Sequence, residues 1–487
     1  MEERRTDLQR AEEKESAEVR SEKVRALFID LYNYFRMDSG VDPIVLFEQL
    51  CCLLIQLSDD GLEFDGAPDP VSSYRTLMAR CKEWDRWGIS DSAAFADRPK
   101  LAGRMLDTAH TAWELIRNRK QLVPPLFDLL EVILRDRPNA ALGTPFRTAR
   151  EIVKLAGSAG NVDPITLFPV ALDPACGGGA FLIALLEQAE KEGVSFSVGI
   201  RGFERDKHLR NCVRLLALLY DGPRSKVTVS DGGSPVEISE DTYHLILANP
   251  PFRSQSLRDR EVIEDNRPLP VPTKDVHRAF LQRILLGLTP GGESAIIVPD
   301  SFLSHTASDA IQVRRWILER FHCKGIVKLP AYTFYPQSMV RASVLFLRRP
   351  LDWREPRPKD GIFFFSVMAD GRSNDSQRLP VAENGFDELE QIWDRQDALW
   401  QEWRDGPRSK NVYGMDVPTD WKQPHFWFGS LEDIARNDFV LLPDRYQPVK
   451  LAGKPTENPK EILVEMQKLG EEMLALTRQL AEAEYGR

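Results

Sequence analysis

Four consecutive residues near the middle of the chain, Asn249-Pro250-Pro251-Phe252, carry groups that could hold a planar amine. The side-chain oxygen of Asn249 can accept a hydrogen bond from an amino group, and the carbonyl of Pro250 can accept a second. The ring of Phe252 offers a flat face on which a nucleobase can stack. The set suits a flipped-out adenine held by its exocyclic amine. The alternative is a turn that only ends a strand with a polar cap.

A glycine-rich turn lies upstream, where an apolar segment ends and Asp173-Pro174-Ala175-Cys176-Gly177-Gly178-Gly179 follows. Glycines let the backbone approach a ligand closely and adopt positive φ. A helix that begins near Ala180 would add exposed N–H donors, which favour a carboxylate or another anion. The segment lacks the Lys-Ser/Thr of a P-loop and the spaced glycines of a dinucleotide fingerprint. It therefore predicts either another kind of ligand-binding turn or a tight strand–helix connection without a ligand.

Two carboxylates follow at the ends of the next two expected strands. Glu204 ends a strand that begins at Gly199, and Asp231 follows a strand that begins at Lys226. Glu204 could accept both hydroxyls of a ribose, and Asp231 could accept a hydrogen bond from the amino group of an adenine ring. Each alone could be an ordinary strand-end carboxylate. Four consecutive strand ends with compatible chemistry favour a single binding site.

These residues need a sheet that brings the carboxyl ends of its strands together. The expected strand at 243–248 must stop at Pro250 and Pro251, because neither residue has a backbone N–H to donate. Downstream, the alternation continues with a helix at 275–288, a strand at 293–298, a helix at 308–321 and strands at 325–329 and 342–347. The pattern predicts a doubly wound α/β core with its ligands at the carboxyl edge of the sheet.

The chain resembles the amino-group DNA methyltransferases that form N6-methyladenine, in particular the modification subunits of type I restriction–modification systems. Asp173 to Phe181 is close to that family's Asp-Pro-Ala-Cys-Gly-Ser-Gly-Gly-Phe, with Gly178 and Ala180 as the departures. Asn249 to Phe252 matches its Asn-Pro-Pro-Phe, and Gly143-Thr144-Pro145 matches a Thr-Pro segment before the first strand. The resemblance is strong over residues 140–350 and weaker to Pro448.

The resemblance implies a Rossmann-like methyltransferase fold, S-adenosyl-L-methionine as cofactor and adenine in double-stranded DNA as methyl acceptor. The candidate catalytic residues are Asn249, Pro250, Pro251 and Phe252. The candidate cofactor-binding residues are Gly143, Thr144, Pro145, Asp173, Pro174, Ala175, Cys176, Gly177, Gly179, Glu204 and Asp231, and no metal site is expected. Two alternatives stay open: a methyltransferase for RNA bases or protein glutamine, and a non-catalytic scaffold in a defence complex.

Composition and periodicity divide the chain into four parts. We expect a helical amino-terminal domain at 1–140, the catalytic domain at 141–350, a mixed carboxyl-terminal extension at 351–457 and an amphipathic helix at 458–487. In this last helix, apolar residues follow the a/d spacing of a coiled coil: Ile462, Met466, Leu469, Met473, Leu476 and Leu480. The helix either docks onto a partner through residues 459–484 or packs on its own domain.

Charge bears on the partners. The formal net charge is −10 and the pI is about 5.5, which is unfavourable for a protein that grips DNA alone. This charge is what we expect of a catalytic subunit that relies on a partner for its grip on DNA. The resemblance implies that this partner is a DNA-specificity subunit, and it leaves open a second copy of the chain and a nuclease or translocase subunit. The six cysteines show no zinc-binding spacing. No apolar signal core or long apolar run appears, so we expect a cytoplasmic protein without a membrane partner, in a restriction or related phage-defence system.

Overall fold

The computed structural model describes residues 2–37, 42–60, 70–81, 95, 97–137, 143–156, 170–193, 199–232, 238–252, 267–336, 338–352, 360–448 and 473. Residues 253–266, which follow Phe252, and, except for Met473, the helix expected at 458–487 lie outside the described residues. No helix among the described residues is both long and apolar enough to cross a membrane.

The core of the described structure is a nine-stranded sheet with the strand order β13-β8-β6-β7-β5-β4-β1-β2-β3. The strands are β1 (Val170–Asp173), β2 (Gly199–Glu204), β3 (Val227–Asp231), β4 (Tyr243–Ala248), β5 (Leu288–Pro299), β6 (His322–Lys328), β7 (Ala342–Arg348), β8 (Gly361–Ser366) and β13 (Phe426–Ser430). All neighbours pair in parallel except that β7 is antiparallel to β5 and β6, and β13 is antiparallel to β8. The expected α/β core is confirmed.

The strand order reverses between β1 and β4. From β1 the chain proceeds outward through β2 to β3, and from β4 it proceeds the other way to β5. β1 and β4 are direct parallel neighbours, with Leu172 opposite Ile246, so their carboxyl ends open side by side. In open α/β sheets this reversal leaves a crevice in which ligands bind. The sheet therefore brings the ends of β1 and β4, with Asp173 and Asn249, to one place.

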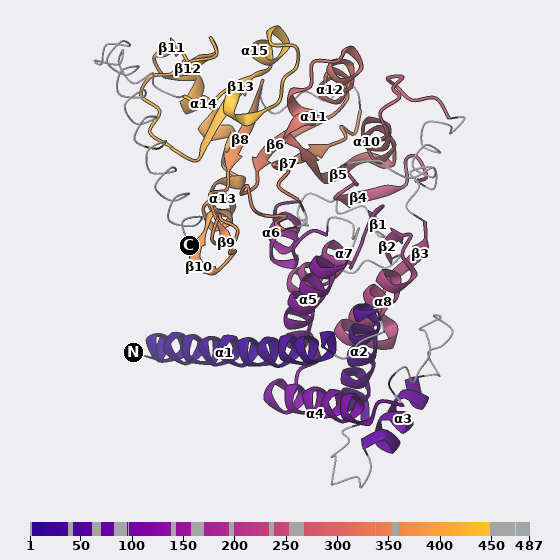
Figure 1. Cartoon of the computed structure of the whole chain (residues 1–487). Coiled ribbons are helices and arrows are strands. Elements are labelled where there is room, and N and C mark those ends of the chain that lie inside the picture. Colours follow the sequence, from indigo (N-terminus) through magenta and orange to yellow (C-terminus); the bar gives the residue numbers. More distant parts are fainter. Residues whose placement is uncertain are drawn as a thin grey trace.

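Helices connect the strands and cover the sheet (Figure 1). They are α6 (Phe146–Ala156), α7 (Ala180–Glu192), α8 (Lys207–Asp221), α10 (Val276–Leu286), α11 (Asp300–Ser304) and α12 (Ser308–Arg320). Asp206 caps α8 by accepting the backbone N–H groups of His208 and Leu209, an arrangement that satisfies two of the N–H groups left over at a helix start. The side chain of Asp275 caps α10 in the same way through the N–H of Arg278.

The sheet continues beyond residue 350, where the sequence placed the end of the catalytic domain. β8 pairs with β6, and β13 pairs with β8, so both strands belong to the central sheet. Their consecutive aromatic residues, such as Phe363, Phe364 and Trp427, are buried. Smaller elements surround them: β9 (Asp370–Arg372), β10 (Pro380–Asn384), β11 (Arg408–Lys410), β12 (Asp416–Pro418), α13 (Gly385–Trp393), α14 (Gln396–Asp405) and α15 (Leu431–Arg436).

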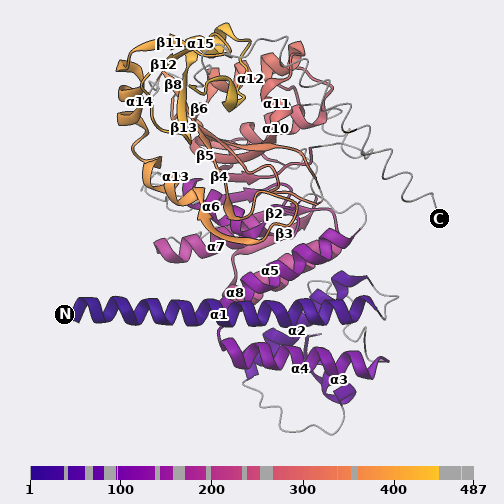
Figure 2. The ribbon, with the colours of Figure 1, turned by 60° about the vertical axis from the view of Figure 1, so that its left-hand side comes forward.

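The amino-terminal helices lie together on one side of the α/β core, as both views show (Figures 1 and 2). They are α1 (Glu2–Arg36), α2 (Pro43–Asp60), α3 (Pro70–Cys81), α4 (Pro99–Ile116) and α5 (Arg119–Asp136). α2 and α5 pack on α8 of the core. The buried carboxylate of Glu48 on α2 accepts a hydrogen bond from the Asn211 amide at 3.2 Å and lies 3.0 Å from the His208 ring. The helical region is therefore joined to the core through both apolar and polar contacts.

Candidate active site

A cavity of about 1360 Å³ opens at the carboxyl edge of the sheet. Its wall combines α5 and the start of α6 with the glycine-rich turn, the ends of β2 and β4, the β6–β7 connection and the β9–β10 hairpin. Eleven of the predicted site residues line it: Gly143, Thr144, Pro145, Asp173, Ala175, Cys176, Gly177, Glu204, Asn249, Pro251 and Phe252. Pro174, Gly179, Asp231 and Pro250 are not among the described residues that line it. The structure thus brings most of both predicted motifs into one cavity.

The glycine-rich turn is closely packed on one side and open on the other. A Cβ atom at Gly178 would lie 2.7 Å from Leu130, and one at Gly179 would lie 2.8 Å from Val213. Gly177 has φ of 52°, and a Cβ atom there would meet nothing within 4 Å. Positive φ strains other residue types. The turn therefore needs glycine for packing at two positions, while at Gly177 it leaves a backbone surface free to face the cavity.

Glu204 holds the glycine-rich turn in place. One carboxylate oxygen accepts the backbone N–H of Gly177 at 2.9 Å, and the other accepts that of Asp206 at 2.8 Å. Burial raises the pKa of Glu204, while these hydrogen bonds act in the opposite direction. A carboxylate offers about four acceptor positions, so Glu204 keeps acceptor capacity toward the cavity.

Two further carboxyls in the wall are more strongly perturbed. Burial raises the pKa of Asp173 to about 8, against a hydrogen bond from the Ala175 N–H and with a further contribution from the charge of Glu204. On α5, burial raises the pKa of Glu131 to about 7, and the neighbouring charge of Asp128 acts in the same direction. A cation in the cavity would stabilise the ionised forms of these groups. A positively charged group of a ligand would therefore be favoured close to these two carboxyls.

Asp231 has a different environment from the one expected for it. Its side chain is 72% exposed, and its carboxylate pairs with Arg210 at 2.9 Å. The next residue, Gly232, does line the cavity. The end of β3 therefore reaches the site through Gly232, and a contact between Asp231 and an adenine ring stays a prediction.

Asn249 and Phe252 stand at the end of β4. Asn249 is 9% exposed and Phe252 is half-buried. The Phe252 ring meets two other rings edge-on, with centroid distances of 6.2 Å to Phe334 and 6.3 Å to His277. Burial lowers the pKa of His277 to about 4, so this imidazole is neutral near pH 7. The two rings fix the position of Phe252 without placing a charge against it.

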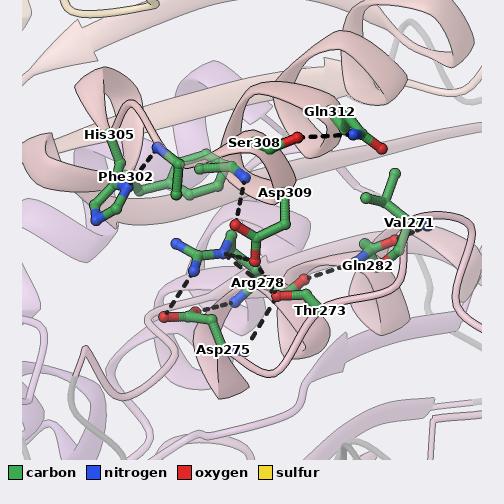
Figure 3. Close-up of polar contacts among 12 residues, drawn as sticks. Val271, Thr273, Asp275, Arg278, Gln282, Phe302, His305, Ser308, Asp309 and Gln312 are labelled. Carbon is green, nitrogen blue, oxygen red and sulfur yellow. Dashed lines mark hydrogen bonds and ion pairs between the residues drawn. The ribbon is translucent and has the colours of Figure 1, made fainter.

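A polar network fixes α10, the helix that carries His277 (Figure 3). The Asp309 carboxylate at the start of α12 accepts hydrogen bonds from the Thr273 hydroxyl at 2.6 Å and the Arg278 guanidinium at 3.1 Å. One turn further on, the Gln282 amide exchanges two hydrogen bonds with the backbone of Val271. These contacts hold residues 271–275, which precede α10, against α10 and the start of α12.

The sequence did not single out several groups that line the cavity. Phe334 and Tyr335 belong to a Tyr-Thr-Phe-Tyr cluster directly after an expected strand, so their position at the sheet edge was a usable signal. Asp370, Arg372 and Arg378 reach the cavity from the β9–β10 hairpin, and Asp128 and Glu131 reach it from α5. Asp370 and Arg372 belong to an Asp-Gly-Arg-Ser segment in the weaker part of the family resemblance, whereas the sequence gives no local signal for Asp128, Glu131 and Arg378.

The chain is similar in sequence to proteins of one family. Residues 126–453 match the family model described as N-6 DNA Methylase. The chain is 24% identical over 353 residues to the type I restriction enzyme MjaIX methylase subunit of Methanocaldococcus jannaschii, which covers 70% of this chain and 59% of that protein. It is also 24% identical over 356 residues to the type I restriction enzyme EcoEI methylase subunit of Escherichia coli, which covers 71% of this chain and 66% of that protein.

The fold is similar to that of the type I restriction-modification system methyltransferase subunit from Streptococcus thermophilus, with a TM-score of 0.62 at 14% identity. The similarity covers 88% of this chain and 99% of that one. The chain thus spans less than two thirds of the two curated relatives but nearly the whole of this structural neighbour. Since the family model covers more than half of the chain, the protein belongs to the N-6 DNA methylase family.

Proposed function

We propose that the protein transfers a methyl group from S-adenosyl-L-methionine to the N6 amino group of an adenine in double-stranded DNA. One observation carries the proposal: Asn249 and Phe252 line the same cavity as Asp173, Gly177 and Glu204. An amine-holding group and a donor-binding turn are useful to this reaction only when they face a common space.

The residues present fit this cofactor, which combines a sulfonium cation with an ammonium, a carboxylate and an adenosine. Asp173 places a carboxyl in the cavity wall, where a bound cation would favour its ionised form, and the open backbone at Gly177 permits close approach. Glu204 has acceptor capacity left for the ribose hydroxyls, and Gly143, Thr144 and Pro145 line the same cavity at the start of α6. When bound, the cofactor supplies an electrophilic methyl group on a positively charged sulfur that is a good leaving group.

Asn249 and Pro250 prepare the acceptor. The lone pair of an adenine amine is delocalised into the ring, which makes this nitrogen a poor nucleophile. The amine would donate hydrogen bonds through its two N–H groups to the Asn249 oxygen and the Pro250 carbonyl. These bonds would draw the nitrogen toward tetrahedral geometry and aim its lone pair at the methyl group. Because Asn249 is 9% exposed, such hydrogen bonds form in a low-dielectric environment that strengthens them. Positioning and electrostatics then carry the rate, and no general base is needed before attack. After transfer, the methylated nitrogen would release one of its two protons to water, which leaves the neutral N6-methylamine.

Base flipping follows from the burial of N6 inside a duplex. Stacking of the base on Phe252 would contribute about 1–3 kcal/mol and so offset part of the free energy needed to unstack it. Phe252 is suited to this because it is only half-buried while Phe334 and His277 hold it edge-on.

We also infer that the protein works with a DNA-specificity subunit in a restriction or related phage-defence system. The support is the net charge of −10, which opposes binding of a polyanion by this chain alone. The a/d pattern of residues 459–484 offers a coiled-coil docking segment. We include two further partners in this proposal: a second copy of the chain, and a nuclease or translocase subunit. With chromosomal DNA as the substrate, the reaction takes place in the cytoplasm.

The variant Asn249→Ala tests the proposal. We would incubate the chain, with and without its co-purified partners, with the labelled methyl donor and with DNA, RNA or protein. Loss of the amine contact should lower the methylation rate by about 10²–10³-fold, as when one positioned hydrogen-bonding group is removed from an active site. Binding of the methyl donor, measured on the same variant, should be unchanged and serves as the control.

Three outcomes would overturn the proposal. A large retained fraction of activity would exclude the assigned role of Asn249. Label found in RNA or protein and not in DNA would show that the methyl acceptor is not DNA. Transfer to none of the three by the complete complex would favour a non-catalytic scaffold.

A further inference from the structure

Two large apolar side chains are exposed at the rim of the cavity. Met339 is 57% exposed and Leu379 is 55% exposed, and both belong to the cavity lining. They come from separate segments, since Met339 lies in the β6–β7 connection and Leu379 lies just before β10. Exposed apolar groups at the mouth of a binding site mark a surface that another molecule covers.

The segment that carries Met339 is held in a defined conformation at the carboxyl edge of the sheet. The backbone N–H of Leu329 donates to the carbonyl of Ala342 at 3.0 Å, which closes the base of the connection. Within it, the N–H of Ser338 donates to the carbonyl of Phe334 at 2.9 Å. Phe334 itself is 3% exposed and meets Phe252 edge-on. Met339 therefore directly follows a turn whose first residue, Phe334, contacts the ring on which the base would stack.

The β9–β10 hairpin, which contains Leu379, is hydrogen-bonded to the β6–β7 connection, which contains Met339. The side-chain oxygen of Asn374, in the β9–β10 hairpin, accepts the backbone N–H of Tyr332 at 3.3 Å. The hairpin is braced by Arg378, whose guanidinium reaches both oxygens of the buried Asp370 carboxylate at 2.9 and 2.8 Å. The two segments that carry Met339 and Leu379 are therefore hydrogen-bonded to each other, and both contribute to the cavity wall.

We infer that Met339 enters the base stack of the duplex at the place that the flipped adenine leaves. The inference rests on the proposed function, because it requires an adenine that leaves the duplex and enters the cavity to reach Asn249. A vacated position in a duplex is a flat apolar gap, and proteins fill such gaps with inserted apolar side chains, methionine among them. Methionine suits this role because its unbranched, flexible side chain adapts to an irregular space. Met339 is then a positioning residue that stabilises the flipped state and does not touch the reacting atoms.

The experiment compares two duplexes that carry the sequence methylated by the active complex. In the first, the target adenine is paired with thymine. In the second, it lies opposite an abasic site, which lowers the cost of flipping. Met339→Ala in the complete complex should methylate the paired duplex about tenfold more slowly, since part of the burial of one apolar side chain is lost. On the second duplex its rate should stay close to that of the wild-type protein.

Two further variants sharpen the test. Met339→Leu keeps an apolar side chain of similar volume and should restore most of the rate on the paired duplex. Met368→Ala is the matched control, because Met368 is 56% exposed and is not among the described residues that line the cavity. It should behave as wild type on both duplexes.

Each contrary outcome has a distinct meaning. Equal rate losses on the two duplexes would overturn the inference, as would wild-type rates of Met339→Ala on both. Failure of Met339→Ala to co-purify with its partner would show that this rim is a protein contact instead. If the wild-type complex methylates neither duplex, the proposed function itself fails and the inference falls with it.

Discussion

Replacement of Glu204 tests whether this residue binds the methyl donor. Its carboxylate accepts the backbone N–H groups of Gly177 and Asp206 and, in our proposal, also the ribose hydroxyls. Glu204→Gln keeps the shape of the side chain but leaves one oxygen, so an amide NH₂ must face one of these donors. Glu204→Ala removes both oxygens and releases the glycine-rich turn.

The expected magnitude follows from these contacts. A hydrogen bond to a charged group contributes about 1.5–3 kcal/mol. Loss of the ribose contact in Glu204→Gln should therefore weaken binding of S-adenosyl-L-methionine by about 1–3 kcal/mol, or about 5–150-fold in Kd. Glu204→Ala should bind more weakly still. The apo-protein should lose less stability than these hydrogen bonds indicate, because the raised pKa of Glu204 shows that burial of its charge already opposes folding.

Isothermal titration calorimetry of the full chain gives the Kd, and thermal unfolding with and without the methyl donor checks the fold. Glu402→Gln is the charge-matched control, since Glu402 is exposed on α14. We expect its Kd to equal that of wild type. An unchanged Kd in Glu204→Ala would remove Glu204 from the ribose site and refute the reasoning.

Two further predictions concern pH and partners. Asp173, with its pKa raised to about 8, is largely protonated at pH 6–7 in the free protein, and a cationic donor favours its ionised form. Binding should therefore release a proton, and Kd should fall by up to about tenfold per pH unit as pH rises toward 8; calorimetry in buffers of different ionisation enthalpy measures this, and Asp173→Asn should abolish it. Deletion of residues 459–484 should spare donor binding but reduce co-purification with the specificity subunit and DNA methylation. Normal complex formation by the truncated chain would contradict the docking segment.

The sequence predicted the strands that carry the site because each has a local signal. The two prolines after Asn249 mark the end of β4, and the glycines after Asp173 mark the turn into α7. The sequence did not predict that β8 and β13 belong to the central sheet. Both are short aromatic runs in a proline-interrupted region, and only their pairing with β6 and with each other makes them strands of the central sheet. Such long-range pairing leaves no periodic pattern within the segment itself.

The wall of the cavity was predictable only in part. Asp173, Glu204 and Asn249 stand at strand ends, where topology alone brings them together. Glu131 and Arg372 come from α5 and from the β9–β10 hairpin, and they reach the cavity because those elements pack there. No spacing in the sequence connects them with the glycine-rich turn.

The packing of α2 on α8 has a consequence for synthesis of the protein. Glu48 and His208, which meet across this contact, are 160 residues apart in the chain. A ribosome that adds about 5–20 residues per second makes the second partner about 8–30 s after the first. During that interval the face of α2 that later covers α8 has no native surface to pack against. The helical region is made first, yet it completes its fold only when α8, which carries His208 and Asn211, has followed.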